Sequence, residues 1–583
     1  MGTISDKLMR IINTKEDIRQ ALISKGYDVP TSIPFKEYAK MILDLPCKVD
    51  SFPDIEGIVA RYSASGLTNE QMAANPVWVD KTGNGHDLQL KNFAWSGMSG
   101  VGGYTENYDS ISWIKAKSRI DVTWTYKSFN ARSIKENMYA QLFYQSSSSN
   151  TGFRVLSCTI KVSGLTDGQG IEYVSNGTRQ FVIMRIENDG IYHLPSFDFG
   201  AKNAYYGFKF LKLQESCNIT IEQLPLYPGA LVFDGVDDYG VCDNFPILTK
   251  EKGYTVVALR QWITYNPNAI SAIATNASDQ SFNGAFTFEN YNKGAEQTIS
   301  YGATQISLQY SKSPFSWQTT SKYNGFNIAN GNKDATNSLV LGRSYPQRNE
   351  FANFAIWELV FLDHDATEEE LTKIKDYFVK TYPWLFPDQA WTVVGKTNED
   401  KDRATIANIT GNGNDLILSN FGFAEGSGYN EQGEYAGYLV TDGVDDKIVS
   451  SVFGMGKDFT IVGDWELINT GKNDNAGIVK FDSIVIYNYN SVLINIKNGR
   501  NILIPDQNTV NAICSDGRIY SKDWKESIYN EETESTSKNF LTIGYSGNVY
   551  TKIAFKNLAI YPTVLSREDC IKAYNYLQTL KAK

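Results

Sequence analysis

Two matching groups of aspartates are the residues of this chain best suited to bind a metal ion. They share one spacing: Asp234, Asp237 and Asp238, and Asp442, Asp445 and Asp446. Clustered carboxylate oxygens are ligands that Ca²⁺ accepts. Each group also contains an Asp-Gly dipeptide, and in such turns carboxylates commonly accept backbone N–H groups instead. We expect the turn arrangement, and therefore predict no metal site and no cofactor.

The sequence lacks the common catalytic motifs. The chain contains no Gly-x-Ser-x-Gly, no His-Glu-x-x-His and no phosphate-binding loop. Histidine, the commonest acid–base residue, occurs three times, as His86, His193 and His364. We assign no catalytic residue from these patterns.

The cysteines do not form a metal-binding pattern. The six cysteines stand at positions 47, 158, 217, 242, 514 and 570, and none forms Cys-x-x-Cys. Structural zinc is therefore excluded. We expect buried free thiols in a reducing compartment, with a Cys158–Cys217 disulfide as the remaining alternative.

Aromatic side chains are abundant enough to suggest sugar binding. Phe, Trp and Tyr make up 13% of the chain. Sugars stack on such rings, but rings also fill the cores of β-sandwiches. The candidates are Trp95, Tyr104, Trp113, Trp124, Trp262, Tyr265, Trp317, Tyr323 and Tyr345. No single one is assigned, so the ligand-binding residues stay unknown at this level.

Composition excludes several classes of partner. The 583 residues are 42% hydrophobic, which supplies several packed cores, and carry a net charge of −10. An acidic chain is a poor partner for nucleic acid or an anionic membrane, and we predict neither. The first residues, MGTISDKLMR, lack the apolar core of a signal peptide, and no apolar stretch is long enough to span a bilayer.

The aspartate groups belong to a repeat. Thr-Gly-Asn-Gly-x-Asp-Leu begins at Thr82 and again at Thr410, 328 residues later. Gly-x-Leu-Val-x-Asp-Gly-Val-Asp-Asp begins at Gly229 and again at Gly437, 208 residues later. The two offsets differ by 120 residues. We infer that a segment of that size, between about Trp95 and Tyr227, is inserted into the first copy.

Short runs of β-forming residues alternate with Gly, Asn, Asp and Ser clusters throughout both copies and the insertion. This pattern predicts antiparallel sandwiches. A helix should close each copy, one capped by Thr367 with Glu370 and one capped by Ser566 with Asp569. The fold class is therefore mostly β: tandem sandwiches with an inserted sandwich, plus a short N-terminal helical segment.

The N-terminal segment differs from the rest of the chain. Apolar residues at helical spacing give two stripes within residues 1–50, which are too short to bury both stripes alone. We expect this segment to attach the chain to a partner or to copies of itself. The predicted domains are 1–50 (helical attachment or oligomerisation segment), 51–95 plus 228–385 (first sandwich), 96–227 (inserted sandwich) and 386–583 (second sandwich).

The repeated motifs, in this order and followed by a late strand and a capped helix, resemble the laminin-G-like, concanavalin-A-type lectin and glucanase jelly roll. The glucanases of that group use a Glu-x-Asp-x-x-Glu strand. Here Asp54-Ile55-Glu56 is followed by Gly57-Ile58-Val59, so the third acid is missing. We therefore predict that the chain is not an enzyme.

Residues 15–42 are similar to short helical modules in tail and fibre proteins of bacteriophages, and the whole arrangement resembles appendage proteins of crAss-like and other Bacteroides phages. This resemblance implies a structural virion protein, a fibre or appendage at head or tail, made in the cytoplasm of the host bacterium. Residues 1–50 would bind other virion proteins or form a homotrimer. The sandwiches would adhere to host surface polysaccharide.

Three alternatives remain at this level. The sandwiches could be purely architectural, packing on other virion proteins without binding a glycan. The chain could instead be a polysaccharide depolymerase, which requires two carboxylates about 5–9 Å apart in an exposed groove. A bacterial surface adhesin is the third, and the missing signal peptide counts against it.

Overall fold

The computed structural model describes Lys15, Ile18 and Arg19, which are helical, and most residues from Phe52 onward. The described ranges are 52–109, 113–115, 120–133, 138–145, 153–176, 180–195, 197–199, 205–213, 217–248, 253–264, 271–277, 287–292, 295–299, 305–307, 318–320, 335–343, 350–431, 435–451, 453–454, 456–468, 477–481, 484–488, 492–496, 500–504, 510–528, 541–546 and 549–582. The rest of the predicted N-terminal segment lies outside them, so its role stays a prediction.

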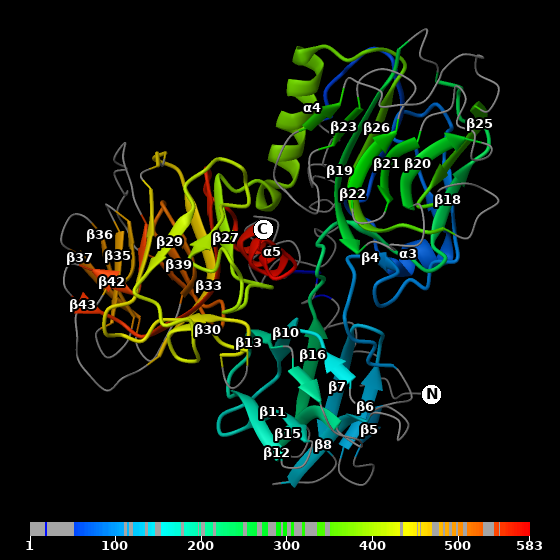
Figure 1. Ribbon diagram of the computed structural model, residues 1–583. Helices are drawn as coiled ribbons and strands as arrows, with labels where there is room; N and C mark the ends of the chain where they lie inside the picture. Colours follow the sequence, from blue (N-terminus) through cyan, green and yellow to red (C-terminus); the bar gives the residue numbers. More distant parts are fainter. Residues whose placement is uncertain are drawn as a thin grey trace. The chain divides into compact units, whose positions relative to one another are not determined.

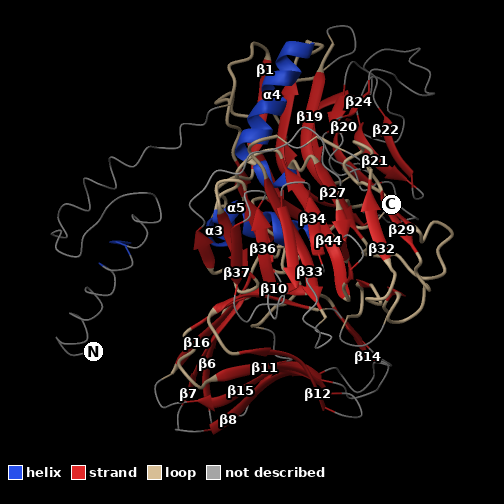
Figure 2. Ribbon diagram, turned by 90° about the vertical axis from the view of Figure 1, so that its left-hand side faces the viewer, coloured by secondary structure: helices blue, strands red, loops and turns tan. Residues whose placement is uncertain are grey.

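Strands dominate the described chain, and nearly all of them pair antiparallel (Figure 2). The sheets belong to one compact unit, Ile55–Leu371 with Phe378–Lys583. They surround three separate hydrophobic clusters. The predicted fold class, tandem β-sandwiches with an inserted sandwich, is confirmed.

The first repeat is a sandwich of two sheets (Figure 1). One sheet has the order β24 (Gln318–Thr320), β23 (Gln305–Ser307), β19 (Thr255–Thr264), β26 (Asn353–Leu362), β17 (Leu231–Asp234) and β4 (Gly100–Val101), with β1 (Ile58–Ser63) also paired to β26. The other has the order β2 (Val77–Trp78), β3 (Leu88–Lys91), β18 (Tyr239–Cys242), β25 (Ala335–Leu341), β20 (Ser271–Ala277), β21 (Thr287–Asn292) and β22 (Ala295–Ile299). Trp78, Phe233 and Phe361 lie fully buried between them.

The second repeat has a similar plan, but the strand in the place of β23 pairs antiparallel with its neighbour, whereas β23 pairs parallel with β19. One sheet has the order β30 (Gly428–Tyr429), β31 (Leu439–Val440), β44 (Ile553–Tyr561), β33 (Thr460–Leu467), β38 (Val510–Cys514), β39 (Arg518–Ser521) and β40 (Glu526–Ile528), with β27 (Gln389–Thr392) paired to β44. The other has the order β28 (Thr405–Ile406), β29 (Leu416–Ser419), β32 (Lys447–Ser450), β41 (Thr542–Ile543), β34 (Gly477–Phe481), β35 (Ile484–Asn488), β36 (Val492–Ile496) and β37 (Arg500–Ile504). A further pair is β42 (Tyr545–Ser546) with β43 (Val549–Tyr550).

The inserted segment builds its own pair of sheets around a third core. One has the order β13 (Gly190–Leu194), β10 (Cys158–Ser163), β16 (Asn218–Gln223), β7 (Ser128–Ser133) and β6 (Ile120–Trp124). The other has the order β12 (Gln180–Ile186), β11 (Gly170–Asn176), β15 (Tyr205–Leu213), β8 (Met138–Gln145) and β5 (Trp113–Lys115), and β14 (Phe197–Phe199) pairs with β9 (Phe153–Val155).

The insertion replaces one hairpin loop of the repeat. In the second repeat, β30 and β31 pair and the Asn430 N–H donates to the Tyr438 carbonyl, closing a loop of residues 431–437. In the first repeat, β4 and β17 pair in the same way, and the Gly102 N–H donates to the Ala230 carbonyl. The loop between those two residues, 103–229, carries the inserted sheets. The exact domain boundaries stay predictions.

Gln223 ties the two ends of the insertion together. Its side-chain oxygen accepts the N–H groups of Thr105 (2.9 Å) and Glu106 (3.0 Å) and the Thr105 hydroxyl (2.8 Å). Gln223 is itself buried, at 1% exposure. The inserted sheets are thus closed on themselves at the point where the chain returns to the first repeat.

Short helices follow the predicted capping patterns. The capping box at Thr367 forms at the start of α4 (Glu368–Thr381), and the Ser566 hydroxyl accepts the Asp569 N–H at the start of α5 (Arg567–Leu577). Two shorter elements are α3 (Asn69–Ala74) and the 3₁₀ turn η1 (Pro383–Leu385). Within the described residues, no helix has the length and apolarity needed to cross a bilayer.

We predict that the insertion can be removed. Replacing residues 103–229 by the loop 431–437 restores the hairpin of the second repeat, so the shortened chain should express as a folded protein with cooperative thermal unfolding. A matched control replaces 97–229 instead, which also removes Ser99, and should be unstable. An unfolded product from the first replacement contradicts this account of the boundary.

Candidate functional site

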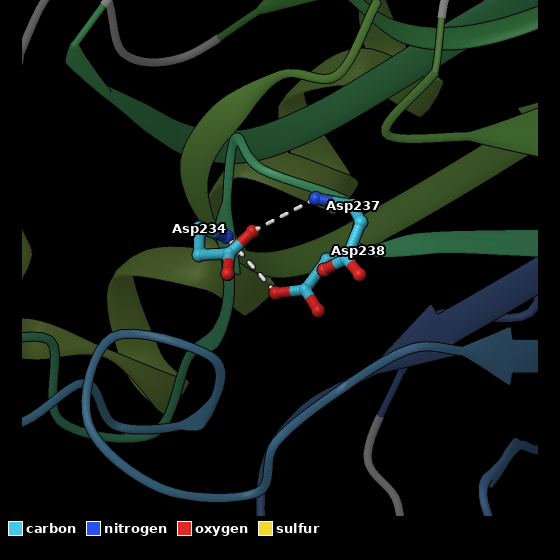
Figure 3. A group of neighbouring side chains, drawn as sticks. All are labelled: Asp234, Asp237 and Asp238. Carbon is cyan, nitrogen blue, oxygen red and sulfur yellow. Dashed lines mark hydrogen bonds between the residues drawn. The ribbon is translucent and has the colours of Figure 1, made fainter. Parts of the chain in front are cut away.

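The first aspartate group forms a tight turn in which the carboxylates bind the chain itself (Figure 3). Oδ1 of Asp234 accepts the N–H groups of Val236 (2.7 Å) and Asp237 (3.4 Å). Oδ2 of Asp238 accepts the N–H of Asp234 (3.0 Å). Gly235 has φ +75, as the Asp-Gly pattern predicts.

The second group repeats these bonds. Oδ1 of Asp442 accepts the N–H groups of Val444 (2.7 Å) and Asp445 (3.3 Å). Oδ2 of Asp446 accepts the N–H of Asp442 (2.7 Å). Because two copies that have diverged elsewhere retain the same bonds, the turn is part of the fold of each repeat.

A serine joins each turn to a distant hairpin. The Ser99 hydroxyl donates to Oδ1 of Asp238 (2.9 Å), and the Ser427 hydroxyl donates to Oδ1 of Asp446 (3.1 Å). Ser99 also accepts the N–H of Ala94 (2.8 Å). Both oxygens of Asp238 therefore have partners, and its side chain is fully buried. We call this arrangement of turn, serine and hairpin the corner of each repeat.

An asparagine completes the corner. Oδ1 of Asn69 accepts the N–H of Val101 (2.7 Å), and Oδ1 of Asn398 accepts the N–H of Tyr429 (2.8 Å). Asn69 lies so close to Gly100 that a Cβ there would collide with it, and Gly100 has φ +135. Sequence reasoning missed Asn69 and Ser99. Aligning the two copies would have found them, because Asn398 and Ser427 stand at the matching positions.

Each corner also holds an aromatic residue in the left-handed conformation. Trp95 has φ +53 and Phe423, at the matching position, has φ +50. Bulky residues are rarely held there, which indicates that the surrounding bonds determine the backbone. Trp95 stacks on Phe93 at 4.8 Å and packs on the core. Trp95 therefore shields one side of the hydrophobic core from solvent.

The Thr-Gly-Asn-Gly motif has a structural role as well. Oδ1 of Asp80 accepts the N–H of Thr82 (3.0 Å), and Thr82 Oγ1 accepts the N–H of Asn84 (3.2 Å). In the second repeat, Asn408 takes the place of Asp80 and accepts the N–H of Thr410 (3.0 Å). Most polar groups of the two motifs are thus used within the fold, and the exposed carboxylates of Asp237 and Asp445 are the exceptions in the Asp-Gly turns.

Burial raises the pKa of one aspartate in each corner. It raises the pKa of Asp238 from its usual 3.8 to about 7, and the pKa of Asp446 to about 6. Hydrogen bonds from Asp234 and Ser99 oppose this shift for Asp238 without cancelling it.

Each group of three carboxylates offers ligand atoms within 4.8 Å of one another. Because Asp238 and Asp446 favour protonation and already have partners, the corner is poorly suited to Ca²⁺. That no metal binds stays a prediction.

The aromatic candidates fall into three groups. Tyr104, Trp113 and Trp262 are buried in the cores. Trp95 and Trp124 are half-buried and pack against core clusters. Tyr265, Trp317, Tyr323 and Tyr345 lie outside the described residues. The structure does not gather the described ones into one site, so the glycan-binding residues stay unassigned.

The disulfide alternative does not hold. Cys158 and Cys217 are free and buried. The register of β10 against β16 pairs Ser163 with Thr220, which places Cys217 beside residue 166, eight residues along the strand from Cys158. At about 3.3 Å per residue, the two are far beyond the reach of a disulfide.

A carboxyl group with altered acidity lies in the inserted sandwich. The Tyr206 hydroxyl donates to both oxygens of Glu106 (2.8 and 2.9 Å), and burial raises the pKa of Glu106 to about 7. The nearby Tyr108 hydroxyl is buried with no hydrogen-bond partner. The hydrogen bond from Tyr206 opposes the effect of burial on this pKa without cancelling it.

Comparisons with solved structures find distant likenesses. The receptor-binding domain of botulinum neurotoxin type G is 12% identical with a TM-score of 0.20, over 32% of this chain and 50% of that chain. The binding domain of Paraclostridial mosquitocidal protein 1 is 13% identical with a TM-score of 0.21, over 31% and 50%. A Trypanosoma rangeli sialidase is 7% identical with a TM-score of 0.22, over 78% and 83%.

The chain spans half the length of the first two of these structures. No protein-family model matches the chain, and no curated protein matches it. At these TM-scores the likenesses assign neither a family nor a function to this chain.

The sialidase matches correct one prediction. We predicted from the missing motif strings that the chain is not an enzyme, and similarity to sialidase structures contradicts that exclusion. The physical reason is that a string search covers neighbours in sequence, whereas a site can draw its acids from separate strands. The prediction is withdrawn, and no reaction is assigned in its place.

The buried Asp238 carboxyl predicts how stability depends on pH. The folded state holds this proton more tightly than the unfolded state, so its contribution to the free energy of unfolding is lost as pH rises from 3.8 through about 7. At about 1.4 kcal/mol per pKa unit, the loss is about 4 kcal/mol at most. Thermal melting between pH 5 and 8 should show D238N flattening the decline, while D237N, at an exposed neighbour, should not. Equal profiles for wild type and D238N contradict the prediction.

From the bonding at the corner we predict that calcium does not change the stability of the protein. Adding millimolar CaCl₂, or removing metal with EDTA, should leave the thermal midpoint unchanged, because the oxygens of Asp238 and Asp446 are already bound within the protein. Differential scanning calorimetry is the measurement. A calcium-dependent rise that disappears in the D237N/D445N variant would overturn this prediction.

Proposed function

We propose that this chain is a structural protein of a bacteriophage particle, a fibre or related appendage that displays lectin-like β-sandwiches of the laminin-G-like, concanavalin-A type. The observation that carries the proposal is the nested architecture: one sandwich occurs twice, and its first copy is opened at a hairpin to hold a third. Such an architecture places several sandwiches on one chain, each of a size that can bind a ligand.

The shared motifs support a display role. Their polar groups are used within the fold of each repeat, at the corner and at the Thr-Gly-Asn-Gly turn. We therefore expect most ligand contacts at positions at which the two repeats differ. We propose host surface polysaccharide as the ligand, held weakly by each sandwich.

Residues 1–50 are proposed as the attachment and trimerisation segment. Joining three chains makes each further sandwich contact intramolecular, which can raise overall binding by about 10²–10⁴ without a new contact. The proposed location is the virion, after synthesis in the host cytoplasm.

The proposal predicts an avidity effect. Deleting residues 1–50 should reduce binding to purified host polysaccharide by about 10²–10⁴ while leaving thermal unfolding of the sandwiches unchanged. Glycan-array binding and light scattering measure affinity and oligomeric state. A monomeric full-length chain, or equal binding by both forms, contradicts the avidity argument.

Two further readouts separate the alternatives. A full-length trimer that binds no glycan while labelled antibody locates it on virions supports a purely architectural role. A fall in capsule viscosity on incubation with the protein supports a depolymerase. The chain's absence from virions contradicts the proposed role.

A further inference from the structure

Both repeats contain the same β-bulge in their central strand. Between β19 and β26 the register passes from Leu259↔Glu358 to Arg260↔Ile356, which leaves Trp357 unpaired. Between β33 and β44 it passes from Asp464↔Asn557 to Trp465↔Phe555, which leaves Lys556 unpaired. Bulges redirect a side chain out of the regular alternation and are common at functional positions.

The unpaired residue differs between the repeats. Trp357 donates its indole N–H to the carbonyl of Pro228 (2.8 Å). Lys556 instead holds a cation whose side chain is only 12% exposed. Its Nζ lies 3.1 Å from Nε2 of His193, a residue of the inserted sandwich, and 3.8 Å from Oδ2 of Asp464. All of these residues belong to the same compact unit.

Donor and acceptor capacity determines the protonation of His193. A lysine ammonium can only donate, so Nε2 of His193 must accept, and the imidazole is neutral with its proton on Nδ1. Nδ1 then donates to the Thr159 hydroxyl oxygen at 3.2 Å. Burial, and secondarily the charge of Lys556, lowers the pKa of His193.

The other polar groups around the contact neutralise Lys556 rather than His193. Asp464 accepts the Tyr438 hydroxyl (3.1 Å) and the Gln578 amide (3.1 Å), and Tyr574 also hydrogen-bonds to it. Lys556 lies over the Tyr438 ring at 5.5 Å, and the His193 ring meets the edge of Tyr574 at 6.2 Å.

Glu466, near both tyrosines, is paired with Lys522 at 3.0 Å. Asp523, beside Gly190 and Tyr192 at the start of the same strand, is paired with Lys525 at 3.0 Å.

The residue after Lys556 has no polar partner. Asn557 is fully buried, and neither of its side-chain polar atoms has a hydrogen-bond partner. An unpaired buried amide is unfavourable. A second hydrogen bond also joins the second repeat to the end of the inserted segment: the side-chain amide of Asn575, in α5, donates to the carbonyl of Pro225.

We propose that Lys556 and His193 form an acid-sensitive latch that holds the inserted sandwich on the second repeat and releases it when His193 takes up a proton. Protonation removes the acceptor at Nε2 and leaves two cations facing each other. A released imidazole protonates near pH 6.5. Below that pH, each further pH unit favours release by up to about tenfold. The latch goes beyond glycan display and does not depend on it.

Hydroxyl-radical footprinting of the full chain tests the latch. Tyr574, 6% exposed in the closed contact, should be oxidised about tenfold faster at pH 5 than at pH 7.5, while Tyr62, buried inside the first repeat, stays protected. H193Q keeps an acceptor for Lys556 and a donor for Thr159 but cannot take up a proton, so its Tyr574 should stay protected at both pH values.

Two further variants complete the test. H364Q removes a histidine bound to Asp363 and Glu370 in the first repeat and should keep the wild-type response. K556Q removes the opposing cation and should reduce the acid response even if H193Q folds poorly. An equal response in wild type and H193Q overturns the latch. Rapid oxidation of wild-type Tyr574 at pH 7.5 also overturns it, because the contact would then not be closed.

Discussion

A hydrogen bond between a serine hydroxyl and an aspartate carboxyl, buried in the first repeat and partly buried in the second, closes each repeat at its corner. In the second repeat this bond joins Ser427 and Asp446, 19 residues apart; in the first it joins Ser99 and Asp238, 139 residues apart. The geometry is the same although 120 more residues separate the partners. A fold can accept an inserted domain where the flanking strands stay paired and the buried polar groups stay satisfied. The corner meets both conditions, because the β4–β17 pairing and the bonds of Asp238 all lie outside the inserted sheets.

The two repeats have a similar backbone fold, but they bury different charged residues. At the bulge of the first repeat, Glu358 is fully buried, pairs with Arg61 at 3.3 Å and accepts the Tyr382 hydroxyl at 2.7 Å. The second repeat has Asn557 at the matching position and a cation at the residue before it. Buried charges are tolerated only with compensating partners. Each repeat therefore draws those partners from different parts of the chain, and this gives two similar sandwiches different neighbours.

The difference between the residues that both repeats share and those that only one repeat has bears on function. Residues that both repeats retain, such as Asp234 and Asp442, are explained by the fold, so the repeated motifs are weak evidence of a shared ligand. Functional differences have to come from residues outside the repeat pattern, including the inserted sandwich and the loops between strands. The same reasoning explains why the search for catalytic strings was uninformative, since the strings that stand out in this sequence are those that the fold repeats.

The sequence by itself determined the local and periodic features. Asp-Gly dipeptides specify left-handed turns, Thr367 and Ser566 specify helix starts, and the change of offset between two motifs located the insertion, because each of these depends on neighbouring residues or on self-similarity. Only the tertiary structure decided which residues meet across long separations. The partners of Asp238, the separation of Cys158 from Cys217, and the contact between His193 and Lys556 follow from strand register and bulges. A one-residue change of register alters every such pairing. Register is set by the packing of whole sheets, which no short stretch of sequence specifies.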